Sequence, residues 1–239
     1  MKESLRLDRY VASVTDYSRS DAKKLIKSGD VAVDGKVLTD PSQAVAADAQ
    51  LEIDGQFVRQ AEHRYFMLHK PQDYVCANRD RRFATVMDLL DEDNLDRLII
   101  AGRLDLDTTG LVLLTDNGQW AHQVMSPRTR CYKRYRVQLE DPVPESAIDR
   151  FAKGVFLEQE KRRTLPARMK LLGEREALLE ICEGRFHQVK RMFASIGNTV
   201  VGLHRESIGK LELDSALGEG EYRSLTEYEV AVVLSGTLE

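Results

Sequence analysis

Two apolar runs enclose a polar segment near the middle of the chain, and this arrangement restricts the fold more than any other feature. Leu98–Ala101 precedes the segment and Leu111–Leu114 follows it, and both runs are typical of buried strands. Residues 102–110 between them contain an arginine, two carboxylates, two hydroxyls and two glycines. Because two buried strands fix this loop, its buried polar groups need hydrogen-bond partners. We therefore expect a sheet-based domain with a structured polar loop between two of its strands.

The residues of this loop divide into two groups. Asp107, Thr108 and Thr109 are typical of a hydrogen-bonded turn, in which side chains cap local amides. Asp105 lies beside Arg103 and between the strand ends, where a functional role is at least as well supported as a structural one. The loop therefore offers one candidate catalytic carboxylate, Asp105, with Arg103 as a supporting cation.

One interpretation of the loop is a phosphatase site. The spacing Asp105-x-Asp107-x-Thr109 is similar to the D-x-D-x-T motif of haloacid-dehalogenase-type phosphatases. In that motif the first aspartate is the nucleophile and Mg²⁺ neutralises the phosphate. The motif normally ends the first strand of a parallel α/β domain, whereas strand-like runs such as Tyr135–Leu139 and Leu178–Cys182 follow here with few crossover helices. A Mg²⁺-dependent phosphatase therefore remains an alternative that fits little of the chain.

The overall composition is that of a soluble globular protein. The chain has 239 residues, of which 42% are hydrophobic and 31% are charged, so it can bury a core in one or two domains. No run approaches the roughly 18 apolar residues of a membrane span, and Met1–Tyr10 lacks the apolar core of a signal peptide. Three widely spaced cysteines exclude a disulfide framework and a Cys-rich zinc site. These features predict a cytoplasmic protein without a membrane segment.

Charge is distributed unevenly along the chain. The total of 35 Lys and Arg against 39 Asp and Glu gives a net charge of −4, which on its own argues against a nucleic-acid binder. Acids dominate residues 86–97 and 211–239, whereas residues 127–136 hold five bases and no acid. Further basic clusters lie at 161–163 and 185–191. Because salt screens charges beyond roughly 8–10 Å, distant acids do not prevent these clusters from binding RNA; the alternative is that each cluster is a solvated face.

The first sixty residues have the pattern of a separate small module. Arg6–Val14 and Arg19–Lys27 show the apolar spacing of helices, with Ser18 as an N-cap and Gly29 as a terminator. Short strands with Asp-Gly turns follow. Four basic side chains lie along one face of the second helix, and they are Arg19, Lys23, Lys24 and Lys27. This face is either solvated or used to bind RNA.

The module resembles the S4-type RNA-binding domain. The matching features include Arg6-Leu7-Asp8, Ser18-Arg19, Leu25-Ile26 and Gly29, and they extend over about residues 5–55. The resemblance implies that the four bases Arg19, Lys23, Lys24 and Lys27 contact RNA phosphates. Contacts of that kind position an RNA without reading its sequence.

Four motifs in the rest of the chain resemble those of RsuA/RluA-type pseudouridine synthases. Gly102–Asp105 is similar to the G/H-R-L-D loop that carries the single catalytic aspartate of that family. Lys133–Tyr135 is similar to the K-x-Y motif, and Gly184–Lys190 to the G-R-x-H-Q-[IV]-[KR] segment. Leu68–Pro71 is similar to the N/H-K-P lead-in, and residues 116–128 favour the RsuA branch, which acts on small-subunit rRNA. The motifs occur in the family's order over nearly the whole chain.

The resemblance implies a role for each residue of the site. Asp105 would act as nucleophile or base, Tyr135 would stack on the target base, and Lys190 would form an ion pair with Asp105. Arg103 would support them, and His187 is expected to have a structural role. An ionised carboxylate in a dry cleft needs such a cation beside it, because desolvation would otherwise protonate it. The remaining basic residues are expected to contact RNA, and they are Arg128, Arg130, Lys133, Arg134, Arg185 and Arg191.

The sequence thus predicts an α+β protein with two domains. Residues 1–57 would form an S4-like RNA-binding domain, residues 58–63 a linker, and residues 64–239 a pseudouridine-synthase catalytic domain on a mixed, largely antiparallel β-sheet. The cleft would lie between the Asp105 loop, the Tyr135 strand and the Lys190 segment.

The same interpretation predicts the partners of the protein. By the resemblance, the substrate is a uridine of the 516 type in 16S rRNA, free or in an assembling small subunit. No cofactor or metal is expected, because the chain has no Gly-rich phosphate loop or metal-ligand spacing. We expect a monomer that does not bind membranes. A non-catalytic rRNA-binding or ribosome-assembly protein would explain the first module and the basic clusters, but not the aspartate loop together with the other motifs.

Overall fold

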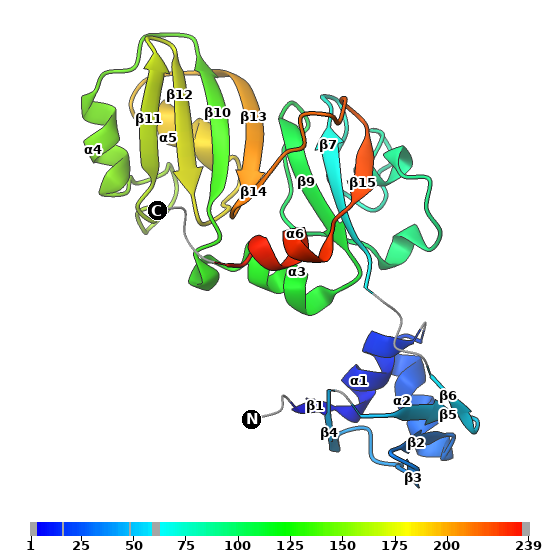
Figure 1. Ribbon diagram of the computed structural model, residues 1–239. Helices are drawn as coiled ribbons and strands as arrows, with labels where there is room; N and C mark the ends of the chain where they lie inside the picture. The colour runs from blue at the N-terminus through cyan, green and yellow to red at the C-terminus, as the bar shows by residue number, and fades with distance from the viewer. Residues whose placement is uncertain (1–3, 16, 48, 59–62, 236–239) are drawn as a thin grey trace. The chain divides into compact units, whose positions relative to one another are not determined.

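In the computed structural model the chain divides after His63 into two compact units, Met1–His63 and Arg64–Glu239 (Figure 1). The structure describes residues 4–15, 17–47, 49–58 and 63–235. Each unit has its own hydrophobic core. Within the described ranges no helix is long and apolar enough to cross a membrane.

The first unit packs two helices, α1 (Leu7–Val14) and α2 (Arg19–Ser28), against small antiparallel sheets. The larger sheet has the strand order β3-β2-β5-β6. Its strands are β2 (Val31–Val33), β3 (Lys36–Val37), β5 (Leu51–Ile53) and β6 (Gln56–Phe57), and β1 (Ser4–Arg6) pairs separately with β4 (Ala44–Ala46).

Local sequence signals set the helix boundaries in this unit. At the start of α2, the backbone N–H of Asp21 donates to Ser18 Oγ over 3.2 Å, as expected of an N-cap serine. Gly29 ends α2 in the left-handed region, at φ 87°, where a residue without a Cβ pays no steric penalty. The predicted helices are therefore confirmed to within one residue at each end.

The second unit is built on a mixed sheet with the order β11-β12-β10-β13-β9-β7-β15 (Figure 1). Strands β9 and β13 run parallel, and the other pairs are antiparallel, which confirms the predicted fold class. Two short strands lie off this path, because β8 pairs with β9 and β14 with β13. The strands are β7 (Tyr65–Lys70), β8 (Ile99–Ile100), β9 (Thr109–Thr115), β10 (Lys133–Leu139), β11 (Arg168–Gly173), β12 (Glu176–Ile181), β13 (Val200–Ile208), β14 (Leu211–Glu212) and β15 (Tyr222–Ser224).

Helices cover this sheet in two groups. The α-helices are α3 (Gly118–Met125), α4 (Ser146–Ala152), α5 (Gln188–Ala194) and α6 (Glu227–Val232), and 3₁₀ turns occur at Val86–Leu89, Leu95–Arg97 and Pro127–Thr129. Helix α4 packs on β11 and α5 on β13, whereas α3 packs on β8 and β9. Helix α6 lies beside α3 (Figure 1), where Trp120 Nε1 donates to the carbonyl of Val230 over 3.0 Å.

Strand β9 is buried on both of its faces. Val112 and Leu114 belong to the core that also contains the β10–β12 residues, and Leu111 and Leu113 belong to the core under α3. The four side chains have no exposed surface, and full burial of each stabilises the fold by roughly 1.5–3 kcal/mol. The polar loop that precedes β9 is therefore anchored on a fully buried strand segment, as the sequence predicts.

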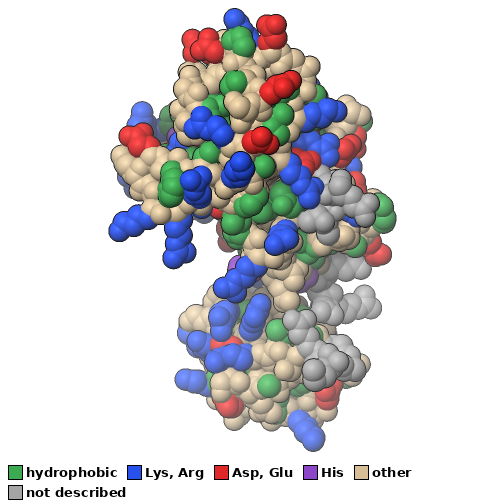
Figure 2. All heavy atoms as spheres, turned by 90° about the vertical axis from the view of Figure 1, so that its left-hand side faces the viewer, with side chains coloured by type: hydrophobic (Ala, Val, Ile, Leu, Met, Phe, Trp, Pro, Cys, Tyr) green, Lys and Arg blue, Asp and Glu red, His purple; other side chains and the backbone are tan. Residues whose placement is uncertain are grey.

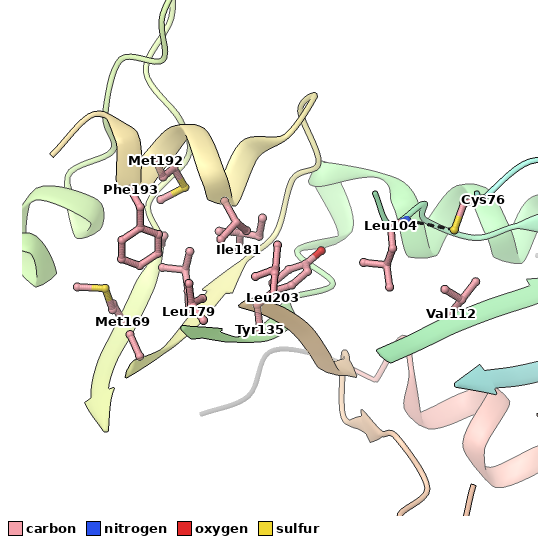
Figure 3. Packing of buried hydrophobic residues seen from close by; sticks show 14 of the residues in the cluster. Cys76, Leu104, Val112, Tyr135, Met169, Leu179, Ile181, Met192, Phe193 and Leu203 are labelled. Carbon is pink, nitrogen blue, oxygen red and sulfur yellow. Dashed lines mark hydrogen bonds between the residues drawn. The ribbon is translucent and has the colours of Figure 1, made fainter. Parts of the chain in front are cut away.

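The sequence predicts short strands at Tyr74–Cys76 and at Leu98–Ala101, and both are wrong in extent. Val75 forms only an isolated bridge with Thr85, and of Leu98–Ala101 only Ile99 and Ile100 pair with β9. Near Val75, Cys76 instead turns its thiol toward the loop, where Cys76 Sγ accepts a hydrogen bond from the backbone of Leu104 over 3.2 Å (Figure 3). Loop hydrogen bonds of Val75 and Cys76, and no regular strand, thus hold this part of the chain.

The predicted linker, residues 58–63, lies largely outside the described residues, which omit 59–62. Val58 packs against the core of the first unit, and its backbone N–H donates to the carbonyl of Leu51 over 2.9 Å. The division after His63 lies at the far end of the predicted linker.

Candidate active site

The polar loop is closed by a tight approach of β9 to β13. Gly110 has φ 107°, and a Cβ on it would lie only 2.4 Å from the carbonyl oxygen of Arg205. A side chain cannot be placed there without moving one of the two parallel strands. Gly110 thus allows β13 to pass directly behind the loop and brings the side chain of Arg205 beneath it.

Arg205 is a buried arginine that binds the loop through its backbone. Its side chain is 1% exposed, and it donates from Nε to the carbonyl of Leu111 over 2.7 Å and from Nη2 to the carbonyl of Gly102 over 2.9 Å. Nη1 lies 3.4 Å from the hydroxyl of Tyr135. In the described part of the chain no carboxylate lies within ion-pair distance of this guanidinium. Arg205 therefore ties both ends of the loop to β13 and reaches Tyr135.

Lys70 binds the loop from another strand. Its ammonium is fully buried at the end of β7 and donates to the carbonyls of Pro71 (2.8 Å), Leu106 (3.2 Å) and Thr108 (2.8 Å). Burial lowers the pKa of Lys70, because desolvation disfavours the charged ammonium. Carbonyl oxygens accept hydrogen bonds from this ammonium, and other carbonyl oxygens accept them from Arg205. Two buried cations thus hold the backbone on which Asp105 lies.

Sequence reasoning missed both of these roles. Lys70 was expected only as part of a lead-in motif, and Arg205 was not a candidate at all. The signal for Arg205 is its position in a strand where Leu203, Arg205 and Ser207 alternate as buried residues. A charged side chain on the buried face of a strand needs a specific set of partners.

Asp105 is a partly accessible carboxylate on this loop. Its side chain is 31% exposed. His187 Nε2 lies 3.6 Å from Oδ1, and Lys190 Nζ lies 3.8 Å from Oδ2. The structure therefore brings together the three residues, from the loop and from the segment that begins α5.

Lys190 makes its shortest contacts with a different carboxylate. Its Nζ lies 2.6 Å and 2.7 Å from the two carboxylate oxygens of Asp107. Burial raises the pKa of Asp107, but the hydrogen bond and charge of Lys190 outweigh this effect, so the net shift is downward. Asp107 was expected only to form the turn, and it also pairs with Lys190. The contact of Lys190 with Asp105 is longer than its contact with Asp107.

The segment before α5 is fixed by its own side chains. Gln188 is buried, accepts a hydrogen bond from the backbone of Arg185 over 2.9 Å, and donates to Glu183 Oε1 over 2.9 Å. His187 has φ 46° in the left-handed region, so its ring is directed by a turn and not by the helix. This turn sets the position from which His187 approaches Asp105.

Tyr135 forms the wall opposite the loop. Its side chain is only 8% exposed on β10, next to Leu203 of β13 and near Ile181 of β12 (Figure 3). The cleft in front of it has a volume of about 280 Å³. Its lining includes Arg103, Asp105, Tyr135, Phe186, His187 and Leu203. Asp105 and Tyr135 thus face one cleft, as predicted, and Lys190 reaches it through its contact with Asp105.

The side chain of Arg103 is exposed at the cleft, and it forms no ion pair or hydrogen bond within the part of the chain that the structure describes. The supporting role predicted for Arg103 therefore rests on its position in the lining. By contrast, the other charged neighbours of Asp105 are held by defined partners.

The basic residues expected to bind RNA fall into free and occupied groups. Arg128 and Arg130 are exposed at the 3₁₀ turn after α3. Arg134 pairs with Glu180 over 3.1 Å, and Arg185 and Arg191 both pair with Glu160. Figure 2 shows Lys and Arg side chains spread over one face of each unit, with Asp and Glu between them.

Lys133 requires a correction. Its side chain is buried and its Nζ donates to the carbonyl of Val124 over 2.8 Å, while burial lowers the pKa of the ammonium. Because the residues of β10 alternate between faces, Lys133 points inward with Tyr135. We therefore exclude Lys133 from the RNA-binding surface.

In the first unit, a buried carboxylate organises the predicted basic face. Asp8 has no exposed surface, and its oxygens lie 3.2 Å from Arg6 Nε, 2.9 Å from Arg19 Nη2 and 3.7 Å from Lys23 Nζ. Lys24 pairs with Asp21 over 2.9 Å, and Lys27 is exposed on the same helix. The outer parts of Arg6, Arg19 and Lys23 are half-exposed, so their donors are held near the surface of the unit.

Metal binding was tested on the side chains that could serve as ligands. In the ranges that the structure describes, no group of three or more His, Cys, Asp or Glu residues is arranged to hold a metal ion.

Comparison with known proteins matches both units. Residues 64–195 match the family model of RNA pseudouridylate synthase, and residues 5–51 match the S4 domain. The chain is 46% identical over 229 residues to the ribosomal small subunit pseudouridine synthase A of Vibrio cholerae serotype O1, covering 96% of this chain and 99% of that protein. It is 47% identical over 231 residues to the protein of the same name from Escherichia coli, covering 96% and 100%.

A solved structure gives the same result for the fold. A crystal structure described as pseudouridylate synthase matches with a TM-score of 0.71 at 44% identity, and the match covers 96% of this chain and 99% of the other. Both resemblances seen in the sequence are therefore confirmed over nearly the full length.

Proposed function

The chain belongs to the RNA pseudouridylate synthase family, and we propose that it isomerises one uridine of 16S rRNA, of the uridine 516 type, to pseudouridine. The observation that carries this proposal is a single cleft lined by the Asp105 carboxylate and the Tyr135 ring, with Lys190 and His187 within 4 Å of Asp105. The substrate follows from the relatives, whose names specify the ribosomal small subunit.

The target uridine must leave its helix to reach the cleft. Unstacking a base costs a few kcal/mol, and stacking on an aromatic ring returns roughly 1–3 kcal/mol. Tyr135 provides this ring, and Arg205 fixes it by lying against its hydroxyl. A ring that is held before the substrate arrives loses little freedom on binding.

The reaction needs one carboxylate and no change in oxidation state. The N1–C1′ bond of the uridine breaks, the uracil turns, and a C5–C1′ bond forms; C5 loses a proton and N1 gains one. Asp105 supplies the carboxylate, as nucleophile or as base at the sugar. Lys190 and His187 lie beside it, and the buried cations Lys70 and Arg205 hold the backbone of its loop.

Binding of the rRNA is assigned to exposed Lys and Arg side chains on both units. In the first unit, Arg19, Lys23, Lys24 and Lys27 along α2 contact phosphates, and in the second Arg128 and Arg130 do so. Arg134, Arg185 and Arg191 contribute less, because Glu180 and Glu160 already hold them. We place this activity in the cytoplasm, in a monomer that acts on free rRNA or on an assembling small subunit.

The proposal is tested by mapping pseudouridines in small-subunit rRNA made with and without the protein. The expected result is one pseudouridine, at the position equivalent to 516, which appears only when the protein is present. Adding a metal chelator to the reaction with purified protein separates the two enzymatic interpretations, because a phosphatase would lose activity without Mg²⁺. A map that is identical with and without the protein would overturn the proposal and leave the non-catalytic rRNA-binding function or the phosphatase.

A further inference from the structure

Phe186 is an exposed aromatic ring beside the active-site cleft. The residue is 73% exposed, although it lies in a segment whose neighbours are well packed. One face of its ring is stacked on His187, with ring centroids 3.7 Å apart and an interplanar angle of 21°. An exposed fraction this high requires that the opposite face be open to solvent. The two rings thus form a stack with one unoccupied face.

The backbone beneath Phe186 is held on both sides. The carbonyl of Phe186 accepts a hydrogen bond from Arg191 Nη1 over 3.1 Å, and the same Nη1 lies 2.9 Å from Glu160 Oε1. On the other side, Gln188 fixes the turn that contains His187. Phe186 is therefore presented from a fixed support and not from a loose loop.

Phe186 separates two adjoining hollows. It lines the cleft of Asp105 and Tyr135, and it also lines a second hollow with Lys161, Arg191 and residues 158–160. When the target base of a polynucleotide enters the first hollow, a neighbouring nucleotide can pass over Phe186 toward the second. Lys161 is exposed in the second hollow, where it can meet a phosphate of the same strand.

We propose that Phe186 is a binding residue that stacks on the base of the nucleotide next to the target uridine. This inference rests on the proposed function, because it assigns a subsite for the same RNA. A base has two π-faces, and once its neighbour has been flipped into the cleft one of them loses its stacking partner. Phe186 replaces that partner, with the His187 ring behind it. Stacking of this kind is sequence-tolerant, so Phe186 contributes affinity and positioning without selecting a base.

The test compares aromatic and aliphatic replacements of Phe186. Phe186→Leu keeps an apolar side chain but removes the π-face, and Phe186→Tyr keeps the face. We expect KM for a small-subunit rRNA fragment to rise by about tenfold in Phe186→Leu, with kcat changed far less, and to return to near wild type in Phe186→Tyr. Phe156→Leu is the matched control, because Phe156 is 55% exposed and carries a cation on its ring but does not line the cleft.

A direct readout of stacking uses RNA with 2-aminopurine on the 5′ or on the 3′ side of the target, in separate molecules. Binding to the Asp105→Asn protein should quench the 2-aminopurine fluorescence of one of these RNAs. The double variant Asp105→Asn, Phe186→Leu should bind without that quenching. Equal quenching with and without Phe186→Leu would overturn the proposal, as would equal KM values for the aliphatic and aromatic variants. Turnover by the wild-type protein is measured first in the same assay, so that failure of the proposed function is recognised separately.

Discussion

Asp8 and Asp105 are two carboxylates in basic surroundings, one in each unit, and they differ in access to solvent. Asp8 has no exposed surface and lies 2.9–3.7 Å from three cations. Asp105 is 31% exposed and lies 3.6 Å and 3.8 Å from its two neighbours. The cations around Asp8 hold it closely, whereas Lys190 and His187 leave part of the surface of Asp105 open.

This difference matches the roles proposed for the two carboxylates, positioning for Asp8 and reaction for Asp105. The oxygens of Asp8 are bound by Arg6, Arg19 and Lys23, and these half-exposed cations face the solvent. In the second unit the order is reversed, because the cations Lys70 and Arg205 are buried and the carboxylate faces outward. Whether the buried charge is a carboxylate or a cation therefore decides which kind of charge the unit presents to solvent.

The largest effect is expected from removing the charge of Asp105. Asp105→Asn keeps the shape of the side chain but supplies neither a nucleophile nor a base, so turnover should fall by at least ~1,000-fold, a loss of roughly 4 kcal/mol in transition-state stabilisation. Binding of rRNA should remain. The measurement is single-turnover pseudouridine formation, together with filter binding.

Asp107→Asn is the matched control for that experiment. Asp107 lies on the same loop and has a 65% exposed side chain, so it should retain activity within about tenfold although it pairs with Lys190. Substantial pseudouridine formation by Asp105→Asn would rule out the role assigned to this residue.

Removing the buried cation under the loop should mainly affect stability. Lys70→Met leaves the carbonyls of Pro71, Leu106 and Thr108 without their donor. Each buried carbonyl left unsatisfied costs roughly 1–3 kcal/mol, so the free energy of unfolding should fall by several kcal/mol. Denaturant unfolding measures the change. Lys210→Met, at an exposed lysine, should stay within about 0.5 kcal/mol of the wild type; equal stability of the two variants would contradict the loop-holding role of Lys70.

Removing the charge of the buried carboxylate should affect the first unit and spare the chemistry. Asp8→Asn leaves Arg6, Arg19 and Lys23 without their common anion, so the unit should lose about 1–3 kcal/mol and bind rRNA more weakly. The rate of the chemical step at saturating RNA should be unchanged. Hydrogen exchange over α1 and α2 gives the local stability. Asp21→Asn, which removes an exposed partner of Lys24, is the control and should have a small effect.

The pH dependence of the same variant sharpens the comparison. Burial raises the pKa of Asp8, but the hydrogen bonds and charges of Arg6 and Arg19 outweigh this effect, and the net pKa is lowered. A carboxyl whose pKa is lowered by folding stabilises the protein above its unfolded pKa of about 3.9, and this stabilisation is lost as the pH falls through the folded value. The stability difference between wild type and Asp8→Asn should therefore be constant near neutrality and shrink below about pH 4. A difference that grows on acidification would have the wrong sign.

The sequence allowed prediction of the elements that depend on local signals. The helices of the first unit, the rigid loop before β9 and the order of the motifs all follow from neighbouring residues, and the structure places Asp105 and Tyr135 at one cleft as expected. The roles of Arg205 and Lys70 could not be predicted in this way, because that of Arg205 depends on the parallel approach of β13 to β9 and that of Lys70 on the pairing of β7 with β9. The same holds for the pairing of Lys190 with Asp107, which joins residues 83 positions apart.

The smallest effect is expected from replacing surface arginines, whose contribution to rRNA binding should depend on whether a carboxylate already pairs with them. Arg128 and Arg130 are exposed, whereas Arg134 is paired with Glu180. If the first two contact phosphates, replacing both with Gln should reduce the salt slope of rRNA binding by roughly 1.4–1.8, since each contact contributes roughly 0.7–0.9. Arg134→Gln should leave the slope nearly unchanged. An equal reduction by Arg134→Gln alone would show that its ion pair opens on binding, and the distinction between free and held cations would then fail in the second unit.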